Sequence, residues 1–218
     1  MNLIEDLGQL NTEMESLIPQ EFQDQMEQST LDLINSNIVD RALKPGDTIP
    51  DFVLPNAIGQ PIKIQDILKS GPVVLSFYRG GWCPYCSLEL RALQRSLPLF
   101  KTFGATLVAL TPETPSHALS TLEKKQLSFE ILSDIGNAIA REFGLVFTLP
   151  EKLRPIYQKL GIDLEAANGN QTFELPIPAT YVVNQDGVIV YAFVDPDYTK
   201  RLEPDIIVSV LENIRAFV

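Results

Sequence analysis

The sequence is poor in the residues that most metal sites and histidine-based catalytic sites need. Its 218 residues include only two cysteines and one histidine. A zinc site of the Cys/His type takes about four such ligands, so this class of site is nearly excluded and we expect no metal. A histidine-based triad would depend entirely on His117. That residue is far from the cysteines along the chain, and we do not expect it to be catalytic.

Basic residues and long apolar runs are also scarce. Lysine and arginine number 17 against 28 acids, a net charge of -11, so nucleic acid and anionic membrane surfaces would repel the chain. No apolar run reaches the roughly 18 residues of a membrane-spanning helix, and the first residues lack the pattern of a signal peptide. We therefore expect a soluble cytoplasmic protein, in which a close pair of cysteines is more often redox-active than structural.

The first 44 residues differ from the rest in charge and in periodicity. They hold nine acids and two bases, and apolar residues recur every three or four positions over 3–18 and 22–38, with Pro19 between. This spacing predicts two amphipathic helices. We expect an acidic helical extension, residues 1–44, that either packs on the main domain or serves as a dimerisation or partner-docking arm.

From residue 45 onward, short apolar runs alternate with helical patterns. The continuous apolar run over 73–78 predicts a buried central strand, and a helix should follow over 84–103. The Asp186-Gly187 pair between two later apolar runs predicts an antiparallel hairpin, and 203–217 a closing helix. This order favours an α/β fold.

Two stretches of this domain are harder to interpret. Residues 149–176 are long for a loop and should carry one short helix over 151–159. This segment either covers the active site or is a tolerated insertion. The polar run over 195–204 either borders the site or, as we expect, is a surface loop that caps the last helix.

Both cysteines lie in one tetrapeptide, Cys83-Pro84-Tyr85-Cys86, between the central strand and its helix. Pro84 suits the first helical position, which puts Cys83 at the helix N-terminus, where free N–H groups and the dipole stabilise a thiolate. A spacing of three residues brings both sulfurs to one side of the first turn. Because Cys86 begins the apolar stripe of the helix, we expect it to be the more buried. Cys83 should be more exposed, more acidic and the attacking thiol.

The segment Phe77-Tyr-Arg-Gly-Gly-Trp-Cys-Pro-Tyr-Cys-Ser-Leu-Glu-Leu resembles the active-site segment of the peroxiredoxin-like (AhpC/TSA) proteins of the thioredoxin superfamily. The resemblance begins near Gly46-Asp-Thr-Ile-Pro-Asp-Phe and continues to the C-terminus, without the acidic extension. It implies a thioredoxin-like three-layer α/β sandwich with a mixed central sheet over residues 45–218. It also implies chemistry by thiols alone, with no cofactor.

The family motif Pro-x-x-x-Thr-x-x-Cys can be carried over position by position. It sets the peroxidatic cysteine on Cys86, the threonine on Cys83, the proline on Arg79 and a family glutamate on Glu89. The resemblance therefore predicts that Cys86 is the attacking thiol, whereas the electrostatics of the helix end predict Cys83. Glu89 is equally well explained as a solvated helix residue.

Three more residues gain a role from the resemblance. The arginine that polarises the peroxide in the family falls on Pro178, which instead looks like the cis-proline of thioredoxins. Arg79 could replace the lost positive charge. Trp82 precedes the cysteine pair as tryptophan does in thioredoxins, and we expect it to shield the sulfurs.

Three functions are compatible with these residues. The first is a thiol-dependent peroxidase that reduces hydrogen peroxide or an organic hydroperoxide through a sulfenic acid and a Cys83–Cys86 disulfide. A thioredoxin-like protein or glutathione would be its electron donor, and a homodimer is possible. The second is a thioredoxin- or glutaredoxin-like oxidoreductase acting on protein disulfides. The third is a redox-sensing binding protein in which the disulfide alters docking of the acidic extension.

Overall fold

A five-stranded mixed sheet forms the centre of the computed structural model, which describes the backbone of residues 2–216 and the side chains of residues 2–214. The sheet order is β5-β4-β3-β8-β9. The strands are β3 (Val73–Phe77), β4 (Thr106–Thr111), β5 (Glu130–Ser133), β8 (Ala179–Val183) and β9 (Ile189–Val194). Pairing is parallel from β3 to β4 and from β4 to β5, and antiparallel from β3 to β8 and from β8 to β9. The predicted mixed sheet and its late hairpin are confirmed.

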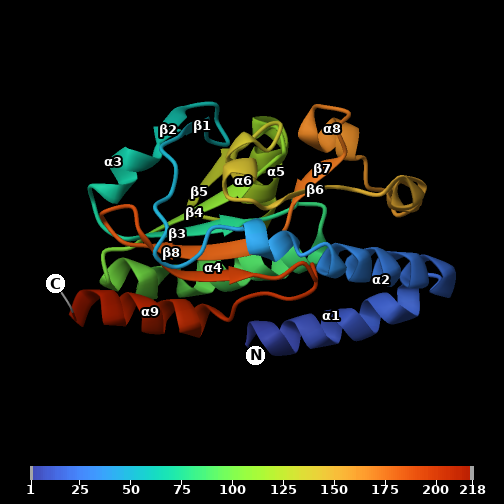
Figure 1. Ribbon diagram of the computed structural model, residues 1–218, viewed down its shortest axis with the longest axis horizontal. Coiled ribbons are helices and arrows are strands. Elements are labelled where there is room, and N and C mark those ends of the chain that lie inside the picture. The colour runs from blue at the N-terminus through green and yellow to red at the C-terminus, as the bar shows by residue number, and fades with distance from the viewer. Residues whose placement is uncertain (1, 217–218) are drawn as a thin grey trace.

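Helices cover both faces of this sheet. In Figure 1, α4 (Pro84–Thr102) and α9 (Pro204–Ala216) lie below it, and α3 (Ile64–Leu68) and α6 (Ala138–Glu142) lie above it. Side chains of β3 alternate between the two faces, because successive residues of a strand point in opposite directions. Val74 packs with α4 and α9, whereas Leu75 packs on the α3 and α6 side. The result is the expected three-layer thioredoxin-like sandwich.

Smaller elements complete the domain. A short hairpin pairs β1 (Val53–Pro55) with β2 (Pro61–Lys63) in antiparallel fashion. Helix α5 (Pro115–Lys125) follows β4 and contributes Ala118 to the core cluster that includes α4. Within residues 2–216, no helix is long and apolar enough to cross a membrane.

The N-terminal extension forms two helices, α1 (Leu3–Leu17) and α2 (Gln20–Asn35), and a 3₁₀ turn, η1 (Ile38–Arg41), leads from them into the domain. Leu3 and Leu7 of α1 are buried in the core cluster of α4. At the start of α1, the Glu203 carboxylate accepts hydrogen bonds from two backbone N–H groups (3.2 and 3.1 Å), which complements the helix dipole. Both helices thus pack on the main body, while the division at residue 45 stays a prediction.

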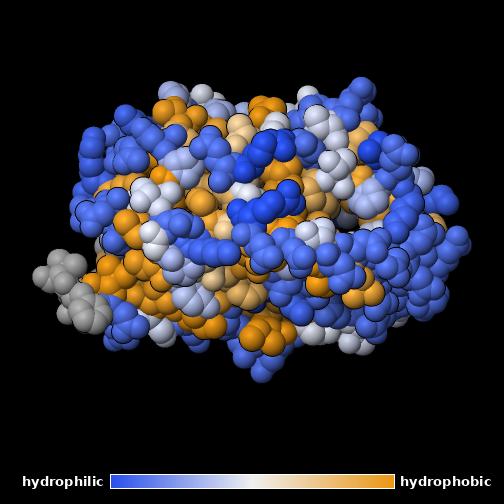
Figure 2. Space-filling view, viewed as in Figure 1, coloured by the Kyte–Doolittle hydropathy of each residue, from blue (hydrophilic) through white to orange (hydrophobic). Residues whose placement is uncertain are grey.

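Part of the apolar stripe of the extension remains uncovered. Leu17 is 72% exposed, and Leu31 and Ile34 of α2 are also exposed. Figure 2 shows polar groups over most of the two helices and apolar side chains gathered near α9. Whether the extension is also a dimerisation arm therefore stays a prediction.

The segment after α6 contains more structure than the sequence predicts. The expected short helix exists as a 3₁₀ turn, η2 (Glu151–Leu153), followed by α7 (Arg154–Lys159), but a further helix, α8 (Leu164–Asn168), follows. The ends of the segment pair as a two-stranded ribbon of β6 (Val146–Thr148) and β7 (Glu174–Pro176). Each of these helices is shorter than two turns and each strand has three residues, too few for a periodic pattern to show in the sequence.

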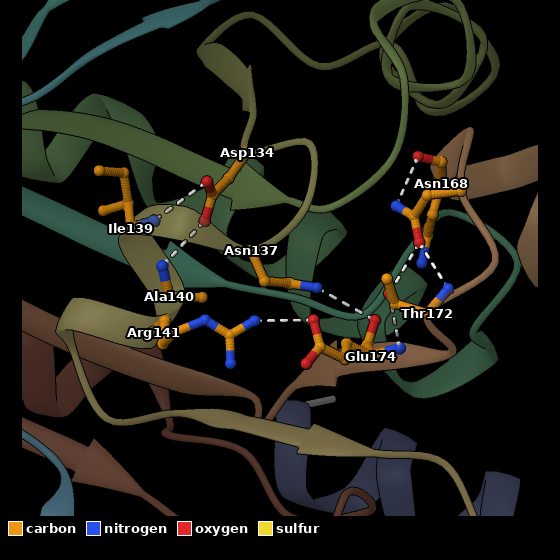
Figure 3. Close-up of polar contacts among 9 residues, drawn as sticks. Asp134, Asn137, Ile139, Ala140, Arg141, Asn168, Thr172 and Glu174 are labelled. Carbon is orange, nitrogen blue, oxygen red and sulfur yellow. Dashed lines mark hydrogen bonds and ion pairs between the residues drawn. The ribbon is translucent and has the colours of Figure 1, made fainter.

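Polar contacts fasten this ribbon to the main domain (Figure 3). The Asp134 carboxylate accepts hydrogen bonds from two backbone N–H groups at the start of α6 (3.1 and 2.8 Å). Asn137 donates from Nδ2 to the Glu174 carbonyl of β7 (3.1 Å), and the Arg141 guanidinium lies 2.7 Å from the Glu174 carboxylate. The segment is therefore fixed on α6 at one end, and its small apolar core meets α2 at the other.

Candidate active site

The two cysteines lie in the first turn of α4, directly after β3. Cys83 is the N-cap residue, with extended backbone angles (φ -81°, ψ 119°), Pro84 occupies the first helical position, and Cys86 follows within the first turn. The two thiols are not joined by a disulfide. Cys83 is 1% exposed and Cys86 0%. Both thiols are therefore buried, and the difference in exposure expected from the sequence is almost absent. Helix-end position does not expose this sulfur, because neighbouring segments close over the end of α4.

The loop before the dithiol needs its two glycines. Gly80 has φ +156°, and a Cβ there would stand 2.1 Å from Nε1 of Trp82. A Cβ on Gly81 would stand 1.9 Å from the hydroxyl of Thr121. The Gly81 N–H donates to the buried carboxylate of Glu113 (2.9 Å). These contacts hold the loop in one conformation and fix the start of α4.

Arg201 lies against Cys86, although the sequence placed it in a surface loop. Its Nη2 donates to Cys86 Sγ (3.1 Å), and its Nε donates to the Glu89 carboxylate (2.6 Å). Its Nη1 donates to the carbonyls of Tyr198 and Lys200, each at 2.6 Å. Arg201 and Glu89 are both buried. The surface interpretation of 195–204 is therefore wrong at this residue, and so is the solvated interpretation of Glu89.

Arg79 is a second buried arginine near the dithiol. It is 3% exposed, and its guanidinium carbon lies 5.0, 5.7 and 4.4 Å from the ring centres of Trp82, Tyr157 and Tyr198. Its Nη2 donates to the Tyr157 hydroxyl, while its buried Nε has no hydrogen-bond partner. Among the described residues no carboxylate pairs with Arg79. This cation is thus stabilised mainly by aromatic faces.

Trp82 and Pro178 are also part of this environment. Trp82 is half-buried and packs edge-on against Tyr157, with 5.8 Å between ring centres. Pro178 lines a cavity together with Arg79. No cis peptide bond occurs among the described residues, so the prediction of a cis-proline at 178 is wrong. The chain passes from β7 into β8 with the Ile177 N–H bound to the Leu145 carbonyl (2.8 Å).

The two thiols differ in acidity. Burial opposes ionisation of Cys83, but the hydrogen bond from Cys86 and the charges of Arg79 and Arg201 outweigh it and lower the pKa of Cys83. Burial and the adjacent Cys83 raise the pKa of Cys86. The field of Arg79 acts more strongly on Cys83, and that of Arg201 more strongly on Cys86. The directions of both pKa shifts favour the thiolate on Cys83 and the proton on Cys86.

The remaining candidate groups lie outside this arrangement. His117 is exposed, and its Nδ1 lies 2.9 Å from the Thr114 hydroxyl. Within the described part of the chain, no group of three or more His, Cys, Asp and Glu side chains is placed to hold a metal ion. Sequence reasoning missed Arg201, Tyr157 and Tyr198, which reach the dithiol from segments more than 70 residues away and carry no local motif.

Comparisons with known proteins agree with this geometry. The sequence profile of the AhpC/TSA family matches residues 45–192, more than half of the chain. The chain belongs to the AhpC/TSA family. The match includes Arg79, both cysteines and Glu89, whereas α1, α2 and Arg201 lie outside it. The resemblance inferred from the CPYC segment is thereby confirmed at the level of the family.

Individual relatives are peroxiredoxins by name. The chain is 36% identical to bcp of Buchnera aphidicola over 103 residues, 47% of this chain and 65% of the relative. It is 29% identical to chloroplastic peroxiredoxin Q of Sedum lineare over 133 residues, 59% of this chain and 71% of that protein. The chain thus spans just under two thirds of the first relative.

Among solved structures, peroxidoxin BcpB of Mycobacterium tuberculosis shares the fold with a TM-score of 0.63 and 23% identity, over 79% of this chain and 98% of that one. The family and these relatives support a thiol-dependent peroxidase, as predicted. They do not favour the disulfide reductase or the redox-sensing binding protein.

Proposed function

We propose that the protein reduces peroxides through a two-cysteine cycle in which Cys83 attacks and Cys86 resolves. The Cys83 thiolate attacks one oxygen of the peroxide, so that an S–O bond forms, the O–O bond breaks, and the leaving alkoxide or hydroxide takes a proton. Cys83 is oxidised to a sulfenic acid and the peroxide is reduced to an alcohol or water. The observation that carries this proposal is a buried dithiol accompanied by two buried arginines, one of which, Arg201, donates to Cys86 Sγ.

The choice of Cys83 rests on acidity and on position. Its pKa is lowered whereas that of Cys86 is raised, and the thiolate is the nucleophile. Cys83 also stands next to Trp82, on the Arg79 side of the site, where a cavity reaches the guanidinium. The alternative, attack by Cys86, is supported by the family motif and by the 3.1 Å contact from Arg201.

Resolution follows from the helical spacing of the two residues. Residues three apart on a helix bring their Cβ atoms to about 5–6 Å, and one S–S bond then needs only a small rotation of side chains. The Cys86 thiolate attacks the Cys83 sulfur, the S–S bond forms, the S–O bond breaks, and the hydroxide leaves as water after protonation. Arg201 stabilises the Cys86 thiolate in this step, because its Nη2 already contacts that sulfur.

The cycle needs a dithiol or two thiols to reduce the disulfide. A thioredoxin-like protein or glutathione is our proposed donor, and a homodimer and a cytoplasmic location remain predictions alongside it. A reducing compartment suits the cycle because it keeps the resting dithiol reduced. A 1-Cys peroxiredoxin of yeast mitochondria, similar in fold at 17% identity, is described with glutathione and thioredoxin systems.

Peroxide consumption by the purified reduced protein tests this function. With dithiothreitol as reductant, the wild type should consume hydrogen peroxide or cumene hydroperoxide over many turnovers, much faster than free cysteine does. The Cys83→Ser/Cys86→Ser double variant serves as the matched control and should fall to the uncatalysed rate. A wild type no faster than free cysteine with both peroxides would refute the proposed cycle.

A further inference from the structure

A cavity of about 220 Å³ lies between α2 and the segment that follows β6. Met26, Ser29 and Leu33 line it from α2. Leu149 and Leu153 line it from the opposite side. Thr30, Asp32 and Ser36 also line it from α2, so apolar groups of Met26, Leu33, Leu149 and Leu153 face one another beside a more polar part of the α2 wall. That wall belongs to the N-terminal extension, which the family match does not include.

The floor of this cavity is polar and charged. Arg79 lines it together with Tyr157 and Tyr198, whose rings pack on the guanidinium. Neither cysteine lines it, so the cavity ends at the guanidinium and not at the sulfurs. Arg79 is 3% exposed, has an unpartnered Nε and has no carboxylate partner among the described residues. Burying a cation without an anion or a full set of hydrogen bonds is costly. A polar oxygen of a bound molecule would supply the missing acceptor.

The size of the cavity limits what else the molecule can carry. An apolar protein cavity of about 150 Å³ takes up benzene, so this cavity has room for a phenyl or branched alkyl group next to a small polar head. Hydrogen peroxide alone would leave the apolar walls without contacts. The shape thus fits a molecule with a polar end at Arg79 and a compact apolar tail along α2.

We propose that α2 forms one wall of a binding subsite for the tail of organic hydroperoxides, with the hydroperoxide group directed at Arg79 and the dithiol. This inference rests on the proposed peroxidase function and extends it to substrate choice. The reaction balance is unchanged, because ROOH is reduced to the alcohol ROH while the two thiols are oxidised to a disulfide. The N-terminal extension then determines specificity, and Ser29 is a specificity-determining position.

Substitution of Ser29 tests the subsite. Ser29→Leu adds bulk to the buried α2 wall and should lower the ratio of kcat/KM for cumene hydroperoxide over that for hydrogen peroxide by about 10-fold or more, because even one methylene of misfit in a hydrophobic pocket changes discrimination by about 10-fold or more. The neighbouring Gln28→Leu adds the same side chain at an exposed position and should leave the ratio within about 2-fold. Ser36→Leu, at the exposed end of the cavity, should move the ratio in the direction of Ser29→Leu.

A binding readout separates this inference from the peroxidase function. The chain has one tryptophan, and Trp82 packs on Arg79, so the product alcohol 2-phenyl-2-propanol should change its fluorescence in the wild type and less in Ser29→Leu. Peroxide turnover with an unchanged substrate ratio in both Ser29→Leu and Ser36→Leu would overturn the subsite. Loss of turnover with every peroxide, in wild type too, would instead refute the proposed function.

Discussion

Two arginines are buried beside the dithiol, and their surroundings differ. Arg201 donates to the Glu89 carboxylate, to Cys86 Sγ and to two backbone carbonyls. Arg79 is enclosed by three aromatic rings, with a single hydrogen bond, to Tyr157, and an unpartnered Nε. The first charge is neutralised within the protein, whereas the second borders a cavity.

This difference indicates a division of work between the two cations. A buried ion pair with its hydrogen bonds satisfied fixes a structure, and removal of one partner leaves an uncompensated charge. A buried cation without a carboxylate partner is ready to bind an incoming oxygen or to stabilise a thiolate. We therefore assign Arg201 mainly to positioning Cys86, and Arg79 mainly to substrate and to the Cys83 thiolate.

The largest expected effect is on stability at Arg201. Arg201→Leu leaves the Glu89 carboxylate buried and unpaired, and we expect the free energy of unfolding to fall by about 3–5 kcal/mol. Burial raises the pKa of Glu89 to about 7 even though Arg201 acts to lower it, so removal of Arg201 raises that pKa further. The folded protein then binds a proton that the unfolded chain has released, and the unfolding free energy falls as pH rises above the ordinary glutamate pKa.

Urea denaturation of the reduced protein at pH 5 and pH 8 measures this penalty. The loss in Arg201→Leu should be larger at pH 8. The double variant Arg201→Leu/Glu89→Leu replaces both partners by apolar groups and should recover most of the stability. A loss below about 1 kcal/mol that does not depend on pH would show that Arg201 is not the fixed structural cation described here.

At Arg79 we expect a smaller loss of unfolding free energy than at Arg201, and a large loss of activity. Arg79→Leu should lower the rate constant for reaction with hydrogen peroxide about 100-fold, the effect of losing one preorganised donor at a reacting oxygen. The unfolding free energy lost in Arg79→Leu should be less than half of that lost in Arg201→Leu. Peroxide consumption and urea denaturation on the same preparations check both. Equal stability losses in the two variants, with activity retained in Arg79→Leu, would reverse the assignment.

The pH dependence of Cys83 reactivity should also follow Arg79. The rate of alkylation of Cys83 by iodoacetamide should reach half its maximum well below the value of about 8.5 for free cysteine, because the pKa of Cys83 is lowered. Arg79→Leu should raise this midpoint by about one pH unit, since a nearby positive charge is lost. A wild-type midpoint at or above that of free cysteine would contradict the proposed thiolate.

Much of this organisation could be predicted from the sequence. The run 73–78 contains the buried strand Val73–Phe77, and the predicted helix spans Pro84–Thr102, because apolar continuity and helical spacing are local signals. Pro84 and its neighbours likewise predict that the CPYC tetrapeptide lies at the start of this helix. Arg79 and Glu89 were named from the family motif, and both are buried near the dithiol.

The remaining features depend on long-range contacts. Arg201 reaches Cys86 across 115 residues of sequence, and nothing in its polar neighbours distinguishes it from a surface arginine. The surroundings of Arg79 depend on Tyr157 and Tyr198, which come from the segment 149–176 and from the loop before α9. Pro178 carries a thioredoxin-like sequence signal, but its peptide bond is trans, because backbone isomer is set by the surrounding structure.

The smallest effect is expected at an exposed arginine, Arg141. It pairs with Glu174 at 2.7 Å, with 55% of its side chain exposed (Figure 3). Arg141→Ala should therefore cost at most about 1 kcal/mol of unfolding free energy and leave peroxide consumption unchanged. A loss comparable to that of Arg201→Leu would mean that burial does not separate the arginines as the comparison requires.

The central claim, that Cys83 is the attacking thiol, can be tested by mass spectrometry after treatment with less than one equivalent of peroxide. Dimedone traps a sulfenic acid as a stable adduct, and Cys83→Ser and Cys86→Ser each retain one thiol. We predict rapid formation of the adduct on Cys83 in Cys86→Ser and little adduct in Cys83→Ser. An adduct on Cys86 in Cys83→Ser, formed as fast as the wild type consumes peroxide, would contradict this assignment and support the register of the family motif.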